Sequence, residues 1–137
     1  MLINLVGLTR GESANILVSV VQHSKPARLG IGIISAGRVG AVLGAALRAC
    51  EHTIVGVHAV SEASRERAAQ LLPEVPILPV EQIAERSELL ILAVPDDELP
   101  GLVAYLASSG QVTAGQLLVH TSGRHGTEVL APATALG

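Results

Sequence analysis

The stretch Arg28-Leu-Gly-Ile-Gly-Ile-Ile-Ser-Ala-Gly-Arg-Val-Gly40 decides the fold of this chain. Its β-branched run, residues 31–34, predicts a strand, and the three small residues 35–37 predict a tight turn. An apolar, alanine-rich helical pattern follows at once over residues 39–47. A strand, a tight turn and a helix in this order are typical of the βαβ unit that binds a dinucleotide.

Three positions fall on the pattern G-x-G-x-x-G of such units: Ser35, Gly37 and Gly40. Gly37 leaves the backbone bare, so phosphate oxygens can reach main-chain N–H groups at the helix start, where the helix dipole favours negative charge. Gly40 lets the helix lie close against the strand. A second register, Gly30-x-Gly32-x-x-Ser35, is rejected because its glycines lie inside the apolar run. A strand-to-helix connection without any ligand stays open as an alternative.

The composition indicates one domain with an aliphatic core. The 137 residues contain no Phe or Trp and one Tyr, so Ala, Val, Leu and Ile must fill the interior, as in a parallel sheet covered by helices. The net charge of −3 gives no electrostatic reason to expect a nucleic-acid partner. Cys50 is the only cysteine, so an internal disulfide is excluded and the cytoplasm is the expected compartment.

The first 27 residues differ from the rest of the chain. Residues 1–8 and 16–21 are apolar, and residues 9–13 interrupt them. Neither run approaches the roughly 20 residues that span a bilayer, and the basic start and cleavage site of a secretory signal are missing. We therefore expect an N-terminal extension at residues 1–27, a dinucleotide-binding domain at residues 28–137, and no membrane partner.

Downstream of the turn, strand patterns alternate with helix patterns. Strands are predicted at residues 53–60, 75–78, 89–94 and 116–120, and helices at residues 61–72, 80–86, from 95–97 to about 108, and from 127. Residues 89–94 are apolar without interruption, as is typical of a central parallel strand buried on both faces. The alternation predicts an α/β fold with a doubly wound, mainly parallel sheet.

The residues after the second strand bear on the choice of cofactor. An NAD-binding unit places a carboxylate there for the adenosine ribose, but residues 58–61 read His-Ala-Val-Ser. Hydroxyl and guanidinium side chains follow instead: Ser61, Ser64, Arg65 and Arg67, with Arg38 in the glycine turn. Such groups suit the 2′-phosphate of NADP. Glu62 argues for NAD, and a solvated helix face is the plainer interpretation of either helix arginine alone. Together the residues favour NADP over NAD.

The end of the fourth predicted strand lies where a ligand crosses the sheet. Val94 and Pro95 stand there, where the ribose and nicotinamide of the cofactor should pass. Asp96 and Asp97 follow, and we expect one of them to cap the next helix rather than to act as a catalytic acid.

The fifth predicted strand ends in His120-Thr121-Ser122-Gly123, close to the expected nicotinamide. His120 and Ser122 are the candidate catalytic residues, because an imidazole and a hydroxyl can position a carbonyl or imine substrate. A strand-end histidine that is bonded to the backbone is an equal alternative. The histidines of the chain show no metal-ligand spacing, so no metal is expected.

Three motifs together carry a family resemblance: Gly37-Arg-Val-Gly40, Leu92-Ala-Val-Pro-Asp-Asp97, and Val119-His-Thr-Ser-Gly123 followed by Glu128-Val-Leu130. Over residues 28–137 the chain resembles the N-terminal half of Rossmann-like proteins that carry a DUF2520 C-terminal domain. These proteins are relatives of pyrroline-5-carboxylate reductase, 6-phosphogluconate dehydrogenase and the F420-dependent NADP reductases. The resemblance implies an NADP-dependent oxidoreductase of undefined substrate. By position, it implies that Ser35, Ala36, Gly37, Arg38 and Val39 hold the pyrophosphate, that Val94 and Pro95 line the cofactor cleft, and that His120, Thr121, Ser122 and Gly123 face the nicotinamide.

Two departures from that family bear on function. Ser35 replaces its usual glycine, which bears on cofactor affinity. The sequence also ends at Gly137, before the sixth strand and the helical C-terminal domain that form the substrate cleft and the dimer in those relatives. We therefore expect the NADP-binding domain of an oxidoreductase that moves hydride between the nicotinamide and a small carbonyl or imine substrate. A non-catalytic dinucleotide-binding or redox-sensing module is the alternative, another nucleotide ligand is a third, and a homodimer stays open.

Overall fold

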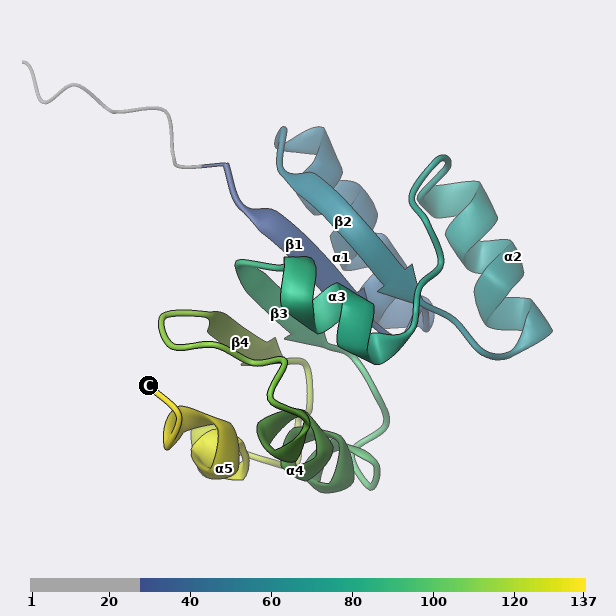
Figure 1. The fold of residues 1–137 in the computed structure, drawn as a ribbon. Helices are drawn as coiled ribbons and strands as arrows, with labels where there is room; N and C mark the ends of the chain where they lie inside the picture. The colour runs from purple at the N-terminus through teal and green to yellow at the C-terminus, as the bar shows by residue number, and fades with distance from the viewer. Residues whose placement is uncertain (1–27) are drawn as a thin grey trace, which may run out of the picture.

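The computed structural model describes residues 28–137, and the predicted extension at residues 1–27 lies outside the described residues. Four parallel strands form one sheet in the order β2-β1-β3-β4 (Figure 1). Their bounds are Gly30–Ile34 for β1, Thr53–His58 for β2, Leu89–Leu92 for β3 and Leu117–His120 for β4. The predicted α/β fold with a doubly wound parallel sheet is confirmed.

Helices cover both faces of the sheet (Figure 1). On one face lie α1 (Arg38–Ala49) and α2 (Glu62–Leu71), where Leu43 and Ala68 belong to the same apolar cluster as Ile33 of β1. On the other face lie α3 (Val80–Arg86), α4 (Leu99–Ser109), the 3-10 helix η1 (Thr127–Leu130) and α5 (Ala131–Thr134), packed against a second cluster that includes Ile34. None of the helices in residues 28–137 has the length and apolarity that a bilayer crossing requires.

The central strands β1 and β3 are buried on both faces, which explains their uninterrupted apolar sequences. Ile33 and Ile34 are 0% and 1% exposed and point into opposite clusters. Ile91 and Leu92 of β3 pair with them in register and divide between the same two clusters. Each such side chain contributes about 1.5–3 kcal/mol when it leaves water. The end of β1 is therefore held rigidly under the turn that follows it.

The predicted strand at residues 75–78 is wrong. The structure has a single bridge there, between Ile77 and Val57 of β2. Val57 donates its N–H to the carbonyl of Pro76 (3.0 Å), and Leu78 donates its N–H to the carbonyl of Val57 (3.0 Å). Pro76 has no N–H to donate, so the ladder cannot extend toward residue 74, and at its other end the chain turns into α3 at Val80.

The predicted cap of α4 by Asp96 or Asp97 is also wrong. α4 begins at Leu99, its N-cap is Glu98, and no side chain of the described residues caps it. The carbonyl of Pro95 accepts hydrogen bonds from the N–H groups of Glu98 (3.0 Å) and Leu99 (3.2 Å), so a backbone turn starts the helix instead. The side chain of Asp97 is left free to contact the end of β4.

We predict that Gly40→Ala lowers the free energy of unfolding by about 2–3 kcal/mol, because α1 lies too close to β1 for a side chain. A Cβ on Gly40 would lie 2.1 Å from the carbonyl oxygen of Ser35 and 3.0 Å from Cβ of Ala93. The matched control is Gly101→Ala in α4, where a Cβ meets nothing within 4 Å. That variant should gain about 0.5–1 kcal/mol from helix propensity. Urea denaturation measures the free energy of unfolding of both variants. A Gly40→Ala protein that is as stable as the parent or as Gly101→Ala would contradict the packing argument.

Candidate functional site

The turn between β1 and α1 is pinned to the neighbouring strand. Ser35 leaves β1 with φ 82°, in the left-handed region. Ala36 is fully buried, and its N–H donates to the carbonyl of His58 at the end of β2 (2.8 Å). Gly37 is the N-cap of α1 and has an extended backbone. The helix therefore starts directly over the end of the sheet.

The first turn of α1 presents main-chain N–H groups to the space above the sheet. Within residues 28–137 no side chain caps the helix, and its first turn contains no acidic residue. Such uncapped N–H groups, together with the helix dipole, favour an anion. A Cβ on Gly37 would lie 3.4 Å from Oγ of Ser35 and 4.0 Å from the carbonyl oxygen of Ala93, in ordinary contact with both, so glycine leaves this volume over the turn unfilled.

A cleft of about 660 Å³ lies over the carboxyl ends of β2, β1 and β3. Ligands of doubly wound sheets bind at this edge. Six of the predicted cofactor-binding residues line it: Ser35, Gly37, Ser61, Ser64, Val94 and Pro95. A second cavity, of about 420 Å³, lies beside β4 and α5 and has no titratable side chain in its lining. The larger cleft is the better candidate, because it combines an apolar wall with polar and charged groups.

The polar wall of the cleft comes from the start of α2. Ser61 caps this helix by accepting a hydrogen bond from the N–H of Ser64 (3.2 Å), and the Ser64 hydroxyl donates to the carbonyl of Ser61 (2.7 Å). Arg67 lines the cleft as well, and its guanidinium Nη1 donates to the carbonyl of Ala36 in the glycine turn (2.9 Å). A fixed positive charge thus stands beside two hydroxyl groups.

Arg67 and His58 line the cleft although the sequence favoured Arg65 as the phosphate ligand. Arg65 is exposed on α2 and is not among the lining residues. No signal in the sequence separated the two arginines, because residue 65 is the i+4 neighbour of residue 61 and residue 67 is the i+3 neighbour of residue 64. The orientation of α2 decides which of them lines the cleft.

The other predicted residues are placed under or beside the cleft. Ala36 and Gly40 are buried below the turn, and Arg38 and Val39 are exposed on the first turn of α1. The main-chain N–H groups of Arg38 and Val39, rather than their side chains, are the parts that a ligand in the cleft would meet. His120, Thr121, Ser122 and Gly123 lie at the end of β4, outside the lining of this cleft.

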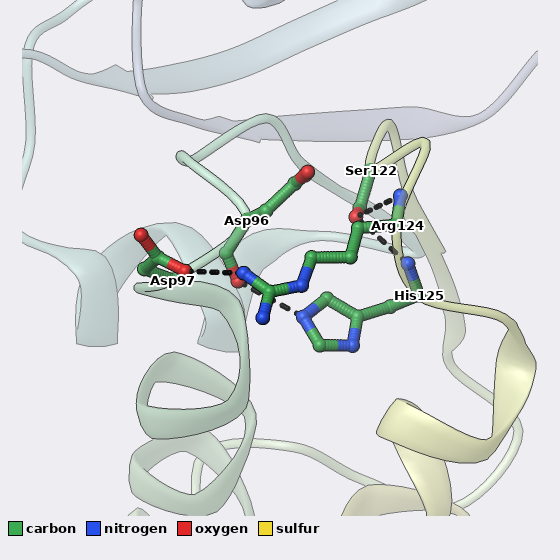
Figure 2. A network of polar contacts seen from close by, with 5 residues as sticks. All are labelled: Asp96, Asp97, Ser122, Arg124 and His125. Carbon is green, nitrogen blue, oxygen red and sulfur yellow. Dashed lines mark hydrogen bonds and ion pairs between the residues drawn. The ribbon is translucent and has the colours of Figure 1, made fainter.

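Both ring nitrogens of His120 are engaged by the loop that follows it. Nδ1 accepts a hydrogen bond from the N–H of Ser122 (3.2 Å), so Nε2 carries the proton, which it donates to the carbonyl of Gly126 (3.2 Å). The Ser122 hydroxyl oxygen accepts from the N–H groups of Arg124 and His125 (3.1 Å each; Figure 2). A catalytic role for His120 and Ser122 stays a prediction, and it requires these contacts to open.

The loop after β4 is tied to the turn after β3, as Figure 2 shows. Arg124 forms an ion pair with Asp97 (2.7 Å), and Nε2 of His125 donates to the carbonyl of Asp96 (3.1 Å). The carboxylate of Glu128 closes the loop by accepting hydrogen bonds from the N–H of Glu128 itself and from the N–H of Gly126. These two bonds lower the pKa of Glu128. The end of β4 is thereby held beside the β3 end of the cleft. Within residues 28–137 no three His, Cys, Asp or Glu side chains gather as metal ligands.

This fold has counterparts among known families and solved structures. The model of the Rossmann-like domain family matches residues 17–137. A Bacteroides fragilis protein, BF3122, provisionally assigned as an NADP oxidoreductase, is 27% identical with a TM-score of 0.56, over 70% of this chain and 36% of that one. A semialdehyde dehydrogenase NAD-binding protein from Cupriavidus necator, in complex with calcium and NAD, is 23% identical with a TM-score of 0.60, over 70% of this chain and 34% of that one.

A third similar structure shares the fold alone. UDP-N-acetylglucosamine 3-dehydrogenase from Acidithiobacillus ferrooxidans is 18% identical with a TM-score of 0.58, over 80% of this chain and 35% of that one. This chain therefore spans about a third of the length of these solved relatives. No curated protein sequence matches it.

We predict that Ser122→Ala destabilises the protein more than Arg124→Ala does. The serine oxygen accepts from two backbone N–H groups, of which that of His125 is half-buried, and the loss of this partner costs about 1 kcal/mol. The ion pair of Arg124 joins side chains that are 67% and 88% exposed, so solvent screens it and its removal changes little. Chemical denaturation of both variants tests this order, and a larger loss for Arg124→Ala would contradict it.

Proposed function

The chain belongs to the Rossmann-like domain family, and from that premise we propose that its cleft binds a nicotinamide dinucleotide, NADP in preference to NAD. In this proposal residues 28–137 are the cofactor-binding domain of an oxidoreductase. The observation that carries it is the uncapped start of α1 at the floor of the 660 Å³ cleft, beside Gly37. Only a ligand with an anionic centre makes use of that arrangement.

The absence of a side chain at Gly37 and the uncapped start of α1 suit a diphosphate. Gly37 leaves open the volume that a side chain would occupy, and the N–H groups that follow it face the same space. The residues on either side suit the rest of a dinucleotide. Val60, Val80, Val94 and Leu102 give the cleft an apolar surface for a flat base. Glu98 lines the cleft from the β3 side, where it suits hydroxyl or amino donors of the ligand.

Preference for NADP is supported by the charges at the β2 end of the cleft. Arg67 is held by Ala36 with its guanidinium in the lining, next to Ser61 and Ser64. The guanidinium with the Ser61 hydroxyl beside it suits the 2′-phosphate, while the Ser64 hydroxyl donates to the carbonyl of Ser61. Glu62, which would favour NAD, is exposed on α2 and is not among the lining residues.

An oxidoreductase role fits the similar structures, of which one is provisionally assigned as an NADP oxidoreductase and another is an NAD-binding protein. The bound nicotinamide would supply the hydride chemistry, and this chain would orient the cofactor and exclude water from one side. The proposal includes two finer parts. The first is kinship with the DUF2520-containing oxidoreductases, and the second is a small carbonyl or imine substrate. His120 and Ser122 would meet that substrate at the end of β4.

A non-catalytic dinucleotide-binding or redox-sensing module is the second candidate. One observation favours it: the His120 ring and the Ser122 oxygen are both engaged by backbone groups of their own loop. The two candidates share the cofactor site and differ in whether the end of β4 takes part in chemistry.

The cofactor proposal predicts that Arg67→Ala selectively weakens NADPH. Loss of a guanidinium–phosphate contact should raise the Kd for NADPH about tenfold relative to the Kd for NADH, measured by the fluorescence of either nucleotide. Taking the ratio cancels any loss that both cofactors share through the contact of Arg67 with Ala36.

Arg65→Ala is the matched control, since it removes the same charge from the same helix outside the cleft. In Arg65→Ala the ratio of the Kd for NADPH to the Kd for NADH should stay within about twofold of the parent's ratio. Equal ratios for the two variants would contradict the assignment of Arg67. A parent protein that binds neither NADPH nor NADH would overturn the proposed function itself.

A further inference from the structure

The outer edge of β4 carries unpaired backbone groups. β4 ends the sheet, and within residues 28–137 its one partner strand is β3 (Figure 1). Leu117 donates its N–H to the carbonyl of Glu88, just before β3 (2.9 Å). Backbone groups alternate in direction along a strand, so Val119 also faces β3, whereas the N–H and C=O groups of Leu118 and His120 face away from the sheet. Such a row of groups is a template for a further strand.

The sheet is apolar on both sides of this edge. Leu117 and Val119 are 54% and 48% exposed, on the face that α1 and α2 cover at the other end of the sheet. On the opposite face the second cavity, of about 420 Å³, opens beside Leu118, and Leu130 and Ala133 line it. A strand added here would place alternate side chains on the open face and in the cavity, as in peptide recognition by strand addition.

The chain itself passes the amino end of this edge on its way into β1. Leu29, the residue before β1, lines a hollow of about 300 Å³ together with Gly115, Gln116 and Leu117, the first residue of β4. The strands are parallel, so their amino ends share one edge of the sheet. Residues 1–27 therefore join the described part of the chain beside the start of β4.

The length and pattern of that preceding stretch suit the edge. Residues 16–21 read Ile-Leu-Val-Ser-Val-Val, a largely β-branched run without a charge. The six residues 22–27 separate it from Arg28 and reach about 20 Å when extended. The outer side of β4 lies three strand spacings from β1, or about 14 Å. The match of the Rossmann-like family model begins at residue 17, inside this run.

We propose that residues 16–21 bind the outer edge of β4 as an antiparallel strand. The antiparallel direction follows because the chain must continue from this segment to Arg28, at the amino end of the sheet. The chain's own segment is favoured over a second copy, because a contact between two β4 strands joins four residues a side, whereas a stable interface takes about 20–30. A tethered segment binds at a high effective concentration, so a short contact suffices. This inference does not depend on the cofactor proposal.

The alternation of the segment selects its alignment. Val18 and Val20 suit the open face, beside Leu117 and Val119. Ser19 then turns toward the cavity, where threonine side chains of η1 and α5 form part of the lining. This alignment sets Val18 opposite Val119, and Cβ atoms of directly opposed residues lie about 4.5–5.5 Å apart.

Amide hydrogen exchange of the full chain tests the proposal. The N–H groups of Leu118 and His120 should exchange at least about tenfold more slowly in the parent than in Val20→Lys, which places a charge on the apolar contact. Val6→Lys, the matched control in the other apolar run, should leave both groups protected. The N–H of Leu117 faces β3 and should stay slow in every variant, which shows that the sheet is intact. Fast exchange of Leu118 and His120 in the parent would overturn the proposal.

A disulfide identifies which copy supplies the segment. In a Cys50→Ser background, Val18→Cys combined with Val119→Cys should oxidise to a cross-linked monomer, because the two Cβ atoms lie within disulfide range. Val18→Cys combined with Arg65→Cys on α2 should stay reduced. Cross-linked dimers in place of monomers, or amide protection that falls on dilution, would assign the edge to a second copy and contradict the proposal.

Discussion

Helix α1 can begin directly over the end of β1 because residue 40 has no side chain. The carbonyl oxygen of Ser35 lies 2.1 Å from the position that a Cβ on Gly40 would take. This close approach fixes the direction of the first turn of α1, and the bond from Ala36 to His58 ties the same turn to β2. The uncapped N–H groups of the helix thereby meet the carboxyl edge of the sheet. The cleft, its charges and its proposed ligand all depend on this contact.

The sequence predicted the elements that depend on local pattern and burial. The turn at residues 35–37 and the apolar run after residue 88 led to β1, α1 and β3, because strands buried on both faces need uninterrupted aliphatic residues. The strand at residues 75–78 failed for a backbone reason. Pro76 removes the N–H that the ladder needs, and periodicity of side chains does not register a missing donor. The cap of α4 failed because a Pro95 carbonyl took the place that a carboxylate was expected to fill.

Within the candidate site, the sequence predicted the segments better than the side chains. The end of β2 and the start of α2 were identified, but Arg65 and Arg67 differ only in which face of the helix they occupy. That face was decided by the packing of α2 against α1 and of Ala68 into the apolar cluster that contains Ile33. The sequence left open a His120 that is bonded to the backbone, and the structure has this arrangement. Which backbone groups bond to it could not be predicted, because they belong to a loop that also contacts Asp96 and Asp97. Ser35 was noticed as a departure from glycine, but its φ emerged only from the structure.

In the function proposed above, two kinds of group divide the recognition of a dinucleotide. Main-chain N–H groups of α1 would face the diphosphate of either cofactor, whereas Arg67 with its neighbouring hydroxyls would distinguish NADP from NAD. The most direct test of the first part is titration of 15N-labelled protein with NADPH, followed through backbone amide chemical shifts. The amides of Gly37, Arg38 and Val39 should shift most. If these amides stay unmoved while those beside the smaller cavity, at Leu117 and Leu130, respond, the cleft over the turn is not the binding site.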